Sequence, residues 1–183
     1  MPDNPRKLNK NELNRVFLNG LGDLVTWSSD EDSVPLLVDI ASSTGFKLRI
    51  RAYLFNLTNP PGGRKADEYK AQLILPGQKK KEKASIDYSD GRMPILAAYA
   101  QEGEDGVFVL WDADKHDKIS FSSNIQVKSD AIIEATYRRV VRSQRTNKEI
   151  VVSVRPQYLY DAIRCRIDIL REETLKGLTS DVE

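Results

Sequence analysis

Apolar residues recur along the chain with two different spacings, which predicts a domain that contains both helices and strands. In residues 9–27 an apolar residue returns every three or four positions, as on one face of a helix, and Asn9 or Asn11 can cap its start. Downstream, short apolar runs are separated by polar or Gly-Pro breaks, as in strands joined by turns. The alternation changes phase within residues 46–57, which indicates a bulge or bend. The predicted strands are residues 36–40, 46–57, 69–75, 93–100, 107–111, 119–127 and 150–154.

Two further helices are predicted in the second half of the chain. Ser129-Asp130 supplies a cap for a helix that continues through Val141, and on this helix Arg139 and Arg142 share one face. The last helix covers residues 157–175. The order of elements predicts an α+β fold: a mostly antiparallel, strand-rich sheet or partly open pseudobarrel, flanked by N- and C-terminal helices.

Composition and charge are those of a globular protein and leave the partner open. Hydrophobic residues make up 40% and charged residues 30% of the chain, and the formal net charge is only +1. Disorder is therefore excluded, and any nucleic-acid binding must come from local patches of charge. There is one cysteine, no apolar run long enough to span a bilayer, and no apolar stretch of a signal peptide. We expect residues 1–183 to form a single cytoplasmic domain without a membrane partner.

Familiar motifs for catalysis and metal binding are absent from the sequence. One His and one Cys cannot form a zinc site with the usual ligand spacing, and neither a phosphate-binding loop nor a nucleophile elbow occurs. A Mg²⁺-dependent endonuclease remains an alternative. Asp112 ends an apolar strand and Gln126 and Lys128 follow on a later one, so the three could surround the metal ion. Apart from this alternative, we predict no cofactor.

Two segments concentrate positive charge. Residues 62–85 contain seven basic and three acidic residues, and residues 128–148 contain six basic and two acidic residues. Lys and Arg side chains contact DNA phosphates, although a solvated loop or helix face can have the same composition. The candidates for phosphate contact are Lys79, Lys80, Lys81, Arg138, Arg139, Arg142 and Arg145.

Residues 111–126 carry groups that could contact bases. Asp112 is predicted to orient His116 or a neighbouring loop, and Trp111 or Tyr69 to line a pocket for a modified base. Hydroxyl, amide and guanidinium groups pair with base edges. The candidates for base contact are Arg64, Lys65, His116, Ser122, Ser123, Asn124 and Gln126. The alternative is a polar strand with Trp111 in the core and an Asp112–His116 pair that fixes a turn.

An ordered set of short motifs resembles the amino-terminal DNA-recognition domains of bacterial restriction-associated proteins. The motifs are Ala66-Asp67-Glu68-Tyr69, Trp111-Asp112 with His116, Ser123-Asn124-Ile125-Gln126-Val127 and Val154-Arg155-Pro156, and the resemblance spans roughly Tyr53 to Arg164. Such domains accompany methylases or are fused to endonuclease modules. The resemblance therefore implies a targeting domain that recognises a DNA sequence or a modified base while another module cuts. Ala113-Asp114 stands where the pattern has a Pro-containing turn.

The leading hypothesis is a non-catalytic DNA-binding module of a bacterial restriction or defence system. Its partners would be double-stranded DNA and a nuclease or methylase module, in cis or in trans. Two alternatives stay open: the Mg²⁺-dependent endonuclease, and a protein-interaction domain of a defence complex whose basic segments are only solvated surface.

Overall fold

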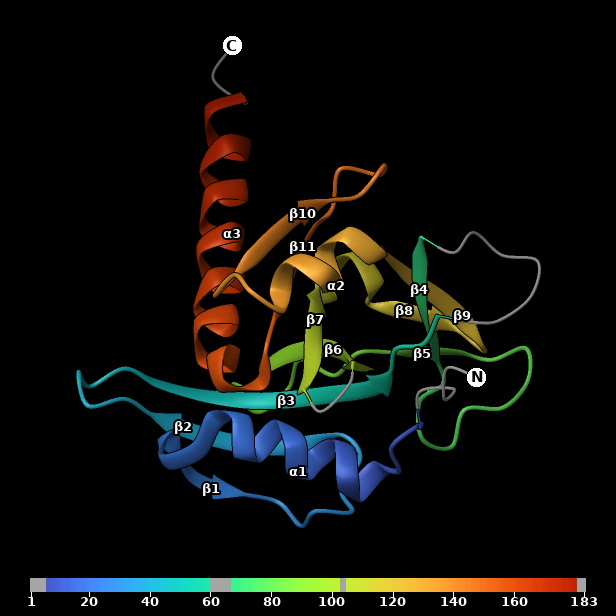
Figure 1. Ribbon diagram of the computed structural model, residues 1–183, viewed down its shortest axis with the longest axis horizontal. Helices are drawn as coiled ribbons and strands as arrows, with labels where there is room; N and C mark the ends of the chain where they lie inside the picture. The colour runs from blue at the N-terminus through green and yellow to red at the C-terminus, as the bar shows by residue number, and fades with distance from the viewer. Residues whose placement is uncertain (1–5, 60–66, 103–104, 181–183) are drawn as a thin grey trace.

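A seven-stranded sheet runs through the centre of the protein (Figure 1). The computed structural model describes residues 6–59, 67–102 and 105–180. The strands lie in the order β1-β2-β3-β6-β7-β11-β10, and neighbours are antiparallel except β3 and β6, which are parallel. They are β1 (Val25–Ser28), β2 (Leu36–Ala41), β3 (Lys47–Asn56), β6 (Met93–Glu102), β7 (Asp105–Trp111), β10 (Val141–Gln144) and β11 (Ile150–Val154). The predicted α+β fold with a mostly antiparallel sheet is confirmed.

Two helices cover one face of this sheet. In Figure 1, α1 (Lys10–Leu21) lies along β3, and α3 (Leu159–Ser180) extends away from the sheet towards the C-terminus. Phe17 of α1 and Ile163 of α3 are fully buried in one apolar cluster with sheet residues that include Val38 and Val152. Short 3₁₀ helices follow α1 (η1, Gly22–Leu24), follow β7 (η2, Ala113–His116) and precede α3 (η3, Pro156–Tyr158).

The opposite face of the sheet is covered by two small strand pairs and a short helix. The strand pairs are β4 (Glu68–Leu73) with β9 (Ser123–Lys128) and β5 (Lys83–Ser85) with β8 (Lys118–Ser120), and the helix is α2 (Ser129–Ala135). Leu73 and Ile125 belong to a second apolar cluster with Val109 and Trp111 of β7. The central strands are therefore buried on both faces.

Burial on both faces explains the irregular pattern in residues 46–57. From Ile50 to Phe55 every residue of β3 is buried. The pairing of β3 runs without a register shift along β2 and along β6. The predicted bulge is therefore wrong: the alternation is lost because apolar side chains are needed on both sides of the strand.

The first helix begins as predicted and ends earlier than predicted. Asn9 caps it, since its side chain accepts from the backbone N–H of Glu12 at 2.9 Å while the Glu12 carboxylate accepts from the backbone N–H of Asn9 at 2.8 Å. The helix stops at Leu21 because Gly22 takes a positive φ of 56° and donates its N–H to the carbonyl of Leu18. Residues 25–27, which the pattern placed in the helix, belong with Ser28 to edge strand β1.

The prediction of a helix from Ser129 through Val141 is correct in its first half and wrong in its second half. Helix α2 ends at Ala135, and Val141–Gln144 form strand β10 of the central sheet. Val141 is buried and lies opposite Ser153 of β11, so sheet pairing and burial of β-branched residues outweigh the local helical pattern. Arg139 and Arg142 consequently do not share a helical face.

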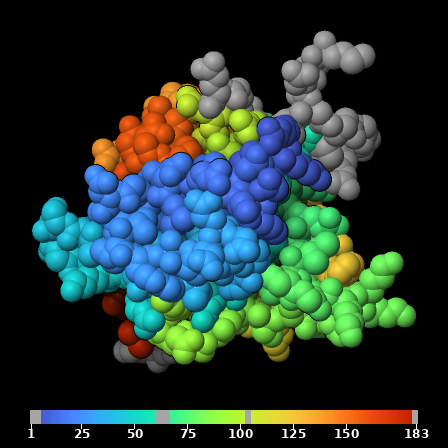
Figure 2. Space-filling view, turned by 90° about the horizontal axis from the view of Figure 1, so that it is seen from below, coloured from blue at the N-terminus to red at the C-terminus, as the bar shows by residue number. Residues whose placement is uncertain are grey.

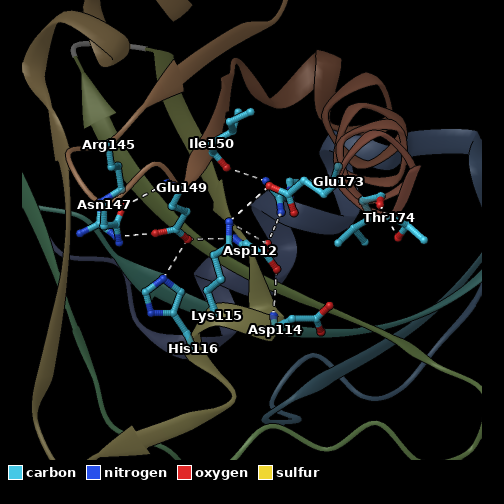
Figure 3. Close-up of polar contacts among 12 residues, drawn as sticks. Asp112, Asp114, Lys115, His116, Arg145, Asn147, Glu149, Ile150, Glu173 and Thr174 are labelled. Carbon is cyan, nitrogen blue, oxygen red and sulfur yellow. Dashed lines mark hydrogen bonds and ion pairs between the residues drawn. The ribbon is translucent and has the colours of Figure 1, made fainter. Parts of the chain in front are cut away.

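A buried carboxylate ties the β10–β11 hairpin to the end of β7 (Figure 3). The Glu149 side chain is 0% exposed. Its Oε1 lies 2.8 Å from Nε2 of His116 and accepts the backbone N–H of Asp112 at 3.1 Å, while Oε2 accepts from Arg145 at 2.5 Å. Burial alone raises the pKa of Glu149, but the hydrogen bonds and charges of His116 and Arg145 outweigh it and lower this pKa to about 2.

A second buried carboxylate, Asp112, ties the same region to α3. Its Oδ2 lies 3.5 Å from the buried Arg166 of α3 and 3.7 Å from Lys115, and its Oδ1 accepts the backbone N–H of Asp114 at 3.0 Å. Arg166 also donates to the carbonyl of Ile150 at 2.6 Å. Because both carboxylates are paired and hydrogen-bonded, they hold β7, η2, β11 and α3 in one arrangement.

Two glycines in helices differ in how much space surrounds them. A Cβ at Gly20 of α1 would lie 2.6 Å from the carbonyl oxygen of Pro156, whereas a Cβ at Gly177 of α3 would meet nothing within 4 Å. We expect Gly20→Ala to destabilise the protein by about 1–3 kcal/mol, because the backbone must shift. Gly177→Ala should stabilise it by up to about 1 kcal/mol through helix propensity. Thermal and urea unfolding measure the stability of both variants. If both substitutions change stability in the same direction, the observed packing of α1 against η3 is contradicted.

Glu149→Gln should lower the free energy of unfolding at pH 7 by about 3 kcal/mol, because Arg145 and His116 lose a buried anionic partner. The pKa of Glu149 is lower in the folded state than its ordinary value of 4.5. The carboxylate therefore stabilises the fold above pH 4.5, and this contribution is lost as the pH falls from 4.5 towards 2. We expect urea unfolding between pH 7 and pH 3 to show that the difference in free energy of unfolding between wild type and Glu149→Gln shrinks as the pH falls below 4.5.

Asp168→Asn is the matched control for this prediction. Its carboxylate forms an exposed pair with Arg171 at 3.8 Å, so the change should cost less than about 1 kcal/mol at any pH. A wild-type advantage over Glu149→Gln that stays constant down to pH 3 would mean that the Glu149 charge does not stabilise the fold.

Candidate nucleic-acid interface

The β4–β9 ribbon has an apolar face and a polar face. Side chains alternate along each strand, and Ala71, Leu73, Ile125 and Val127 are buried against the central sheet. The side chains between them therefore point away from the core. These outward residues are Glu68, Lys70 and Gln72 on β4 and Asn124, Gln126 and Lys128 on β9.

The outward side chains form a ladder of facing pairs. Gln72 lies opposite Asn124, Lys70 opposite Gln126 and Glu68 opposite Lys128. Amide groups offer a donor and an acceptor side by side, the pattern that base edges present, and a two-stranded ribbon fits the major groove of B-DNA. The exposed ladder is therefore suited to contact base edges.

A groove of about 710 Å³ opens beside the Gln72–Asn124 end of the ribbon. Lys7, Lys10 and Lys70 line it, and within the described chain no carboxylate does. Lys10 donates from Nζ to the carbonyl of Leu54 at 3.1 Å and lies 5.0 Å from the ring centre of Phe55, and burial lowers its pKa. Lysines gathered in a hollow strengthen the local positive potential, which favours phosphate. In Figure 2 the start of the chain, dark blue, lies beside the segment around β4 and β5, green.

The exposed lysines 79–81 lie in the turn between β4 and β5, near the same end of the ribbon. Gln78 holds this turn against β8, because it donates to the carbonyl of Ile119 at 2.8 Å and accepts the backbone N–H of Leu75 at 3.0 Å. Within the described chain, Lys79, Lys80 and Lys81 form no ion pair, so their charges remain available to a ligand.

The turn that precedes β9 contributes the two predicted serines. Ser122 has a positive φ of 59° and accepts a hydrogen bond from the side-chain amide of Gln72 at 2.9 Å. Ser123 is half-buried opposite Leu73 of β4. Asn124 and Gln126 therefore share the polar face of β9, whereas Ser123 lies on the opposite face with Ile125 and Val127.

The four arginines predicted to contact phosphates form ion pairs with carboxylates of the same chain. Arg138 lies 3.6 Å from Glu134, Arg139 2.8 Å from Asp161, Arg142 3.3 Å from Glu172 and Arg145 2.5 Å from Glu149. Asp161 and Glu172 belong to α3, so Arg139 and Arg142 fasten the segment after α2 to that helix. Their charge is largely neutralised within the chain, which makes them weaker candidates for phosphate contact than the lysines.

The predicted stacking of a base on Trp111 is wrong. Trp111 is 2% exposed and donates from Nε1 to the backbone carbonyl of Gln126 at 3.4 Å, so it supports the ribbon from beneath and cannot stack on a base. Tyr69 is half-buried and packs against the same core. Trp111 is therefore a core residue, which was the alternative left open by the sequence.

Asp112 and His116 do not form the predicted pair. His116 contacts Glu149, whereas Asp112 contacts Lys115 and Arg166 and caps the turn η2 that carries His116. Asp112 was predicted to orient either His116 or a neighbouring loop, and in the structure it caps the neighbouring turn η2. The His116 side chain is 18% exposed and already engaged, which leaves little of it for a base.

The three residues of the endonuclease alternative lie in different places. Asp112 lines a small cavity with Arg166 and Leu170, whereas Gln126 and Lys128 line another hollow beside α2. In the described ranges there is no group of three His, Cys, Asp or Glu side chains that could hold a metal ion. Arg64 and Lys65 lie outside the described residues.

The site residues predicted from the sequence leave out four residues of this surface. Lys7 and Lys10 come from the N-terminal segment, and their approach to β4 depends on the position of α1. Lys70 and Gln72 could have been found, because they alternate with buried Ala71 and Leu73 and must share the polar face of the strand.

Comparison with models of known protein families gives a match over the central part of the chain. The family model for the methylase-associated X1 domain matches residues 48–163, which run from β3 into the first turn of α3 and include the whole ribbon. No curated protein and no solved structure matches the chain. In the part of the chain that the structure describes, no helix is long and apolar enough to cross a membrane. The family match covers more than half of the sequence, so this chain belongs to the methylase-associated X1 family.

Proposed function

We propose that the chain is a DNA-binding specificity domain of a bacterial restriction-modification or defence system. The observation that carries this proposal is the polar ladder of the β4–β9 ribbon beside a groove lined by three lysines. The family is described as methylase-associated, which fits a role related to restriction and modification. Binding of this kind requires no cofactor.

Local charge supports DNA as the ligand despite the net charge of +1. The acidic side chains that balance the arginines lie on α2, on α3 and beside β11, away from the groove. The lysines of the groove and of the turn at residues 79–81 lie near one end of the ribbon. Phosphates would bind there, because phosphate contacts supply affinity and fix the position of the duplex.

The amides of the ladder would then face the bases. Asn124 is exposed and opposite Gln72, and Gln126 lies two residues further along the same strand. Asn and Gln can pair bidentately with adenine in the major groove. Cleavage or methylation would be supplied by a partner module, a methylase or a nuclease, in cis or in trans.

Loss of a ladder amide should affect one sequence, not all sequences. We expect wild-type protein to enrich a specific motif from a randomised duplex pool, tested with methylated and unmethylated cytosine and adenine. Asn124→Ala should weaken binding to that motif by about 1–3 kcal/mol and leave other duplexes unchanged. Gln157→Ala, an exposed amide on η3, is the matched control. Normal binding of every duplex by Asn124→Ala would show that the ladder does not contact bases.

Loss of a groove lysine should weaken binding to all duplexes alike. For Lys70→Ala we expect lower affinity for every sequence and a slope of log K against log salt that is smaller by about 1, because one phosphate contact is lost. Lys176→Ala on α3, far along the chain from the groove residues, should change neither quantity. If wild-type protein binds no duplex even at low salt, the proposal fails and a protein-interaction domain becomes the better account.

A further inference from the structure

Strand β10 forms one edge of the central sheet, and among the described strands it pairs with β11 alone (Figure 1). This pairing is regular from Val141 to Gln144. At the other edge of the sheet, the pairing of β1 with β2 contains a register shift between Val25 and Trp27. Irregular pairing of that kind hinders the addition of a further strand. The edge of β10 is regular and is therefore open to a further strand.

The outer edge of β10 presents free backbone groups. The N–H of Arg145 donates to the carbonyl of Glu149 at 2.8 Å, so these two residues form a hydrogen-bonded pair. Bonded and non-bonded pairs alternate along an antiparallel ladder, so Ser143 also bonds β11, whereas the N–H and C=O groups of Arg142 and Gln144 point outwards. Within the described chain these outward groups have no hydrogen-bond partner. The edge therefore offers two donors and two acceptors to an added strand.

A hollow of about 290 Å³ lies along this free edge, and we call it the edge hollow. Residues 141–144 of β10 and residues 145–146 of the following turn line it. The side chains of a strand alternate between the two faces of the sheet, so a hollow over one face would meet only every second residue. The edge hollow therefore follows the edge of β10, where the outward backbone groups lie. Its far wall is formed by the start of α2 and by the end of the ribbon that holds Glu68 and Lys128.

The edge hollow has an excess of negative charge. Its carboxylates belong to Glu68, Asp130 and Glu134, and in the described structure only Glu134 is paired, with the exposed Arg138 at 3.6 Å. The arginines of the lining are neutralised by carboxylates outside it. Among the described residues of the lining, the remaining cation is Lys128, which forms no ion pair. The edge hollow therefore attracts basic side chains and repels phosphate.

The side of the edge hollow that faces the core is apolar. Val127, Ala131 and Val141 line it and are each at most 5% exposed. In a strand added along β10, every second side chain would point to this apolar floor and to the carboxylates beside it. A segment in which an apolar and a basic residue stand two positions apart would place both of them on this side.

We propose that β10 binds an extended segment of a partner protein as an additional strand, and that this segment carries a basic and an apolar residue two positions apart. Its main chain pairs with the outward backbone groups of Arg142 and Gln144, which supplies affinity. Its lysine or arginine lies against the carboxylates of Asp130 and Glu134, and its apolar side chain packs on the floor. These two side chains supply the specificity.

A basic segment of another protein fits the edge hollow better than other occupants. Pairing of β10 with the β10 of a second copy would bring two acidic hollows together. Duplex DNA would place phosphates against carboxylates. The edge hollow lies at the Glu68–Lys128 end of the ribbon, opposite to the lysine groove, so a bound segment leaves that groove free. The inference does not depend on the proposed function.

A peptide titration of the whole chain, followed by ¹H–¹⁵N NMR, tests the inference. The probe is an acetylated, amidated peptide of the sequence Thr-Val-Thr-Lys-Thr-Val-Thr-Lys. At saturation the backbone N–H signals of Arg142 and Gln144 should move downfield, and their exchange with D₂O should slow by about tenfold, because they gain hydrogen bonds. The N–H of Ser143 already bonds β11, so its signal should change much less. Unchanged Arg142 and Gln144 signals would overturn the inference.

Methylation of the peptide's backbone nitrogens separates strand pairing from simple attraction of charge. The N–H groups of an added strand point alternately towards β10 and away from it. One peptide is N-methylated at its threonines, and a second at its valines and lysines. One of the two should lose the effect on Arg142 and Gln144, and the other should keep it. Loss in both peptides, or in neither, contradicts strand addition.

A charge variant tests the basic character of the segment. Asp130→Asn combined with Glu134→Gln should weaken binding of the lysine peptide about three- to tenfold, because exposed charge contacts are lost. A peptide with serine in place of lysine should bind this variant and the wild type equally. Asp168→Asn, which changes an exposed carboxylate of α3, is the matched control and should bind the lysine peptide normally. Equal binding of the lysine peptide by wild type and double variant would refute the assigned charge preference.

Spectra without peptide, recorded over a range of protein concentrations, test pairing between copies. The Arg142 and Gln144 signals should stay constant. Shifts that grow with concentration would show that a second copy occupies the edge, which overturns the inference. Duplex DNA should leave these two signals unchanged, whereas signals of Lys70 and Asn124 report on the proposed function, so the two ideas can fail separately.

Discussion

The position of the candidate interface depends on the burial of the second face of the central sheet. β6 and β7 carry apolar side chains on both faces, and α1 and α3 cover only one of them. The other face must be removed from water, and the apolar side of the β4–β9 ribbon together with α2 does this. Because strand side chains alternate, anchoring Leu73 and Ile125 in the core directs Gln72 and Asn124 outwards. The polar ladder is therefore a consequence of the packing beneath it.

Charge is distributed by the same architecture. The buried carboxylates Glu149 and Asp112 draw Arg145 and Arg166 inwards, and residues of α3 engage Arg139 and Arg142. Arginine thereby fastens the β10–β11 hairpin to α3. Among the described residues, the lysines of the groove and of the turn at residues 79–81 form no ion pair. A chain with almost no net charge can thus present a positive surface on one side.

The ribbon places the polar ladder beside the lysine groove, and this arrangement gives the proposed function its geometry. The lysine groove at one end suits the phosphates of a duplex. The polar ladder beside it carries the amides that we propose contact base edges. The family is described as methylase-associated, which fits a role related to restriction and modification.

Local sequence determined those features that depend on nearby residues. The Asn9 cap, the β6–β7 hairpin, the strand at Ile150 and the polar residues of β9 follow from periodicity, capping and turn chemistry within a few positions. Tertiary structure decided the rest. Residues 141–144 became an edge strand because β11 offered hydrogen bonds and burial, and residues 46–57 lost their alternation because both faces of β3 are covered. Likewise, tertiary packing places His116 against Glu149 and Trp111 in the core. It also places Lys7 and Lys10 in the same groove as Lys70. Each of these outcomes depends on contacts between segments far apart in the chain, which no local pattern encodes.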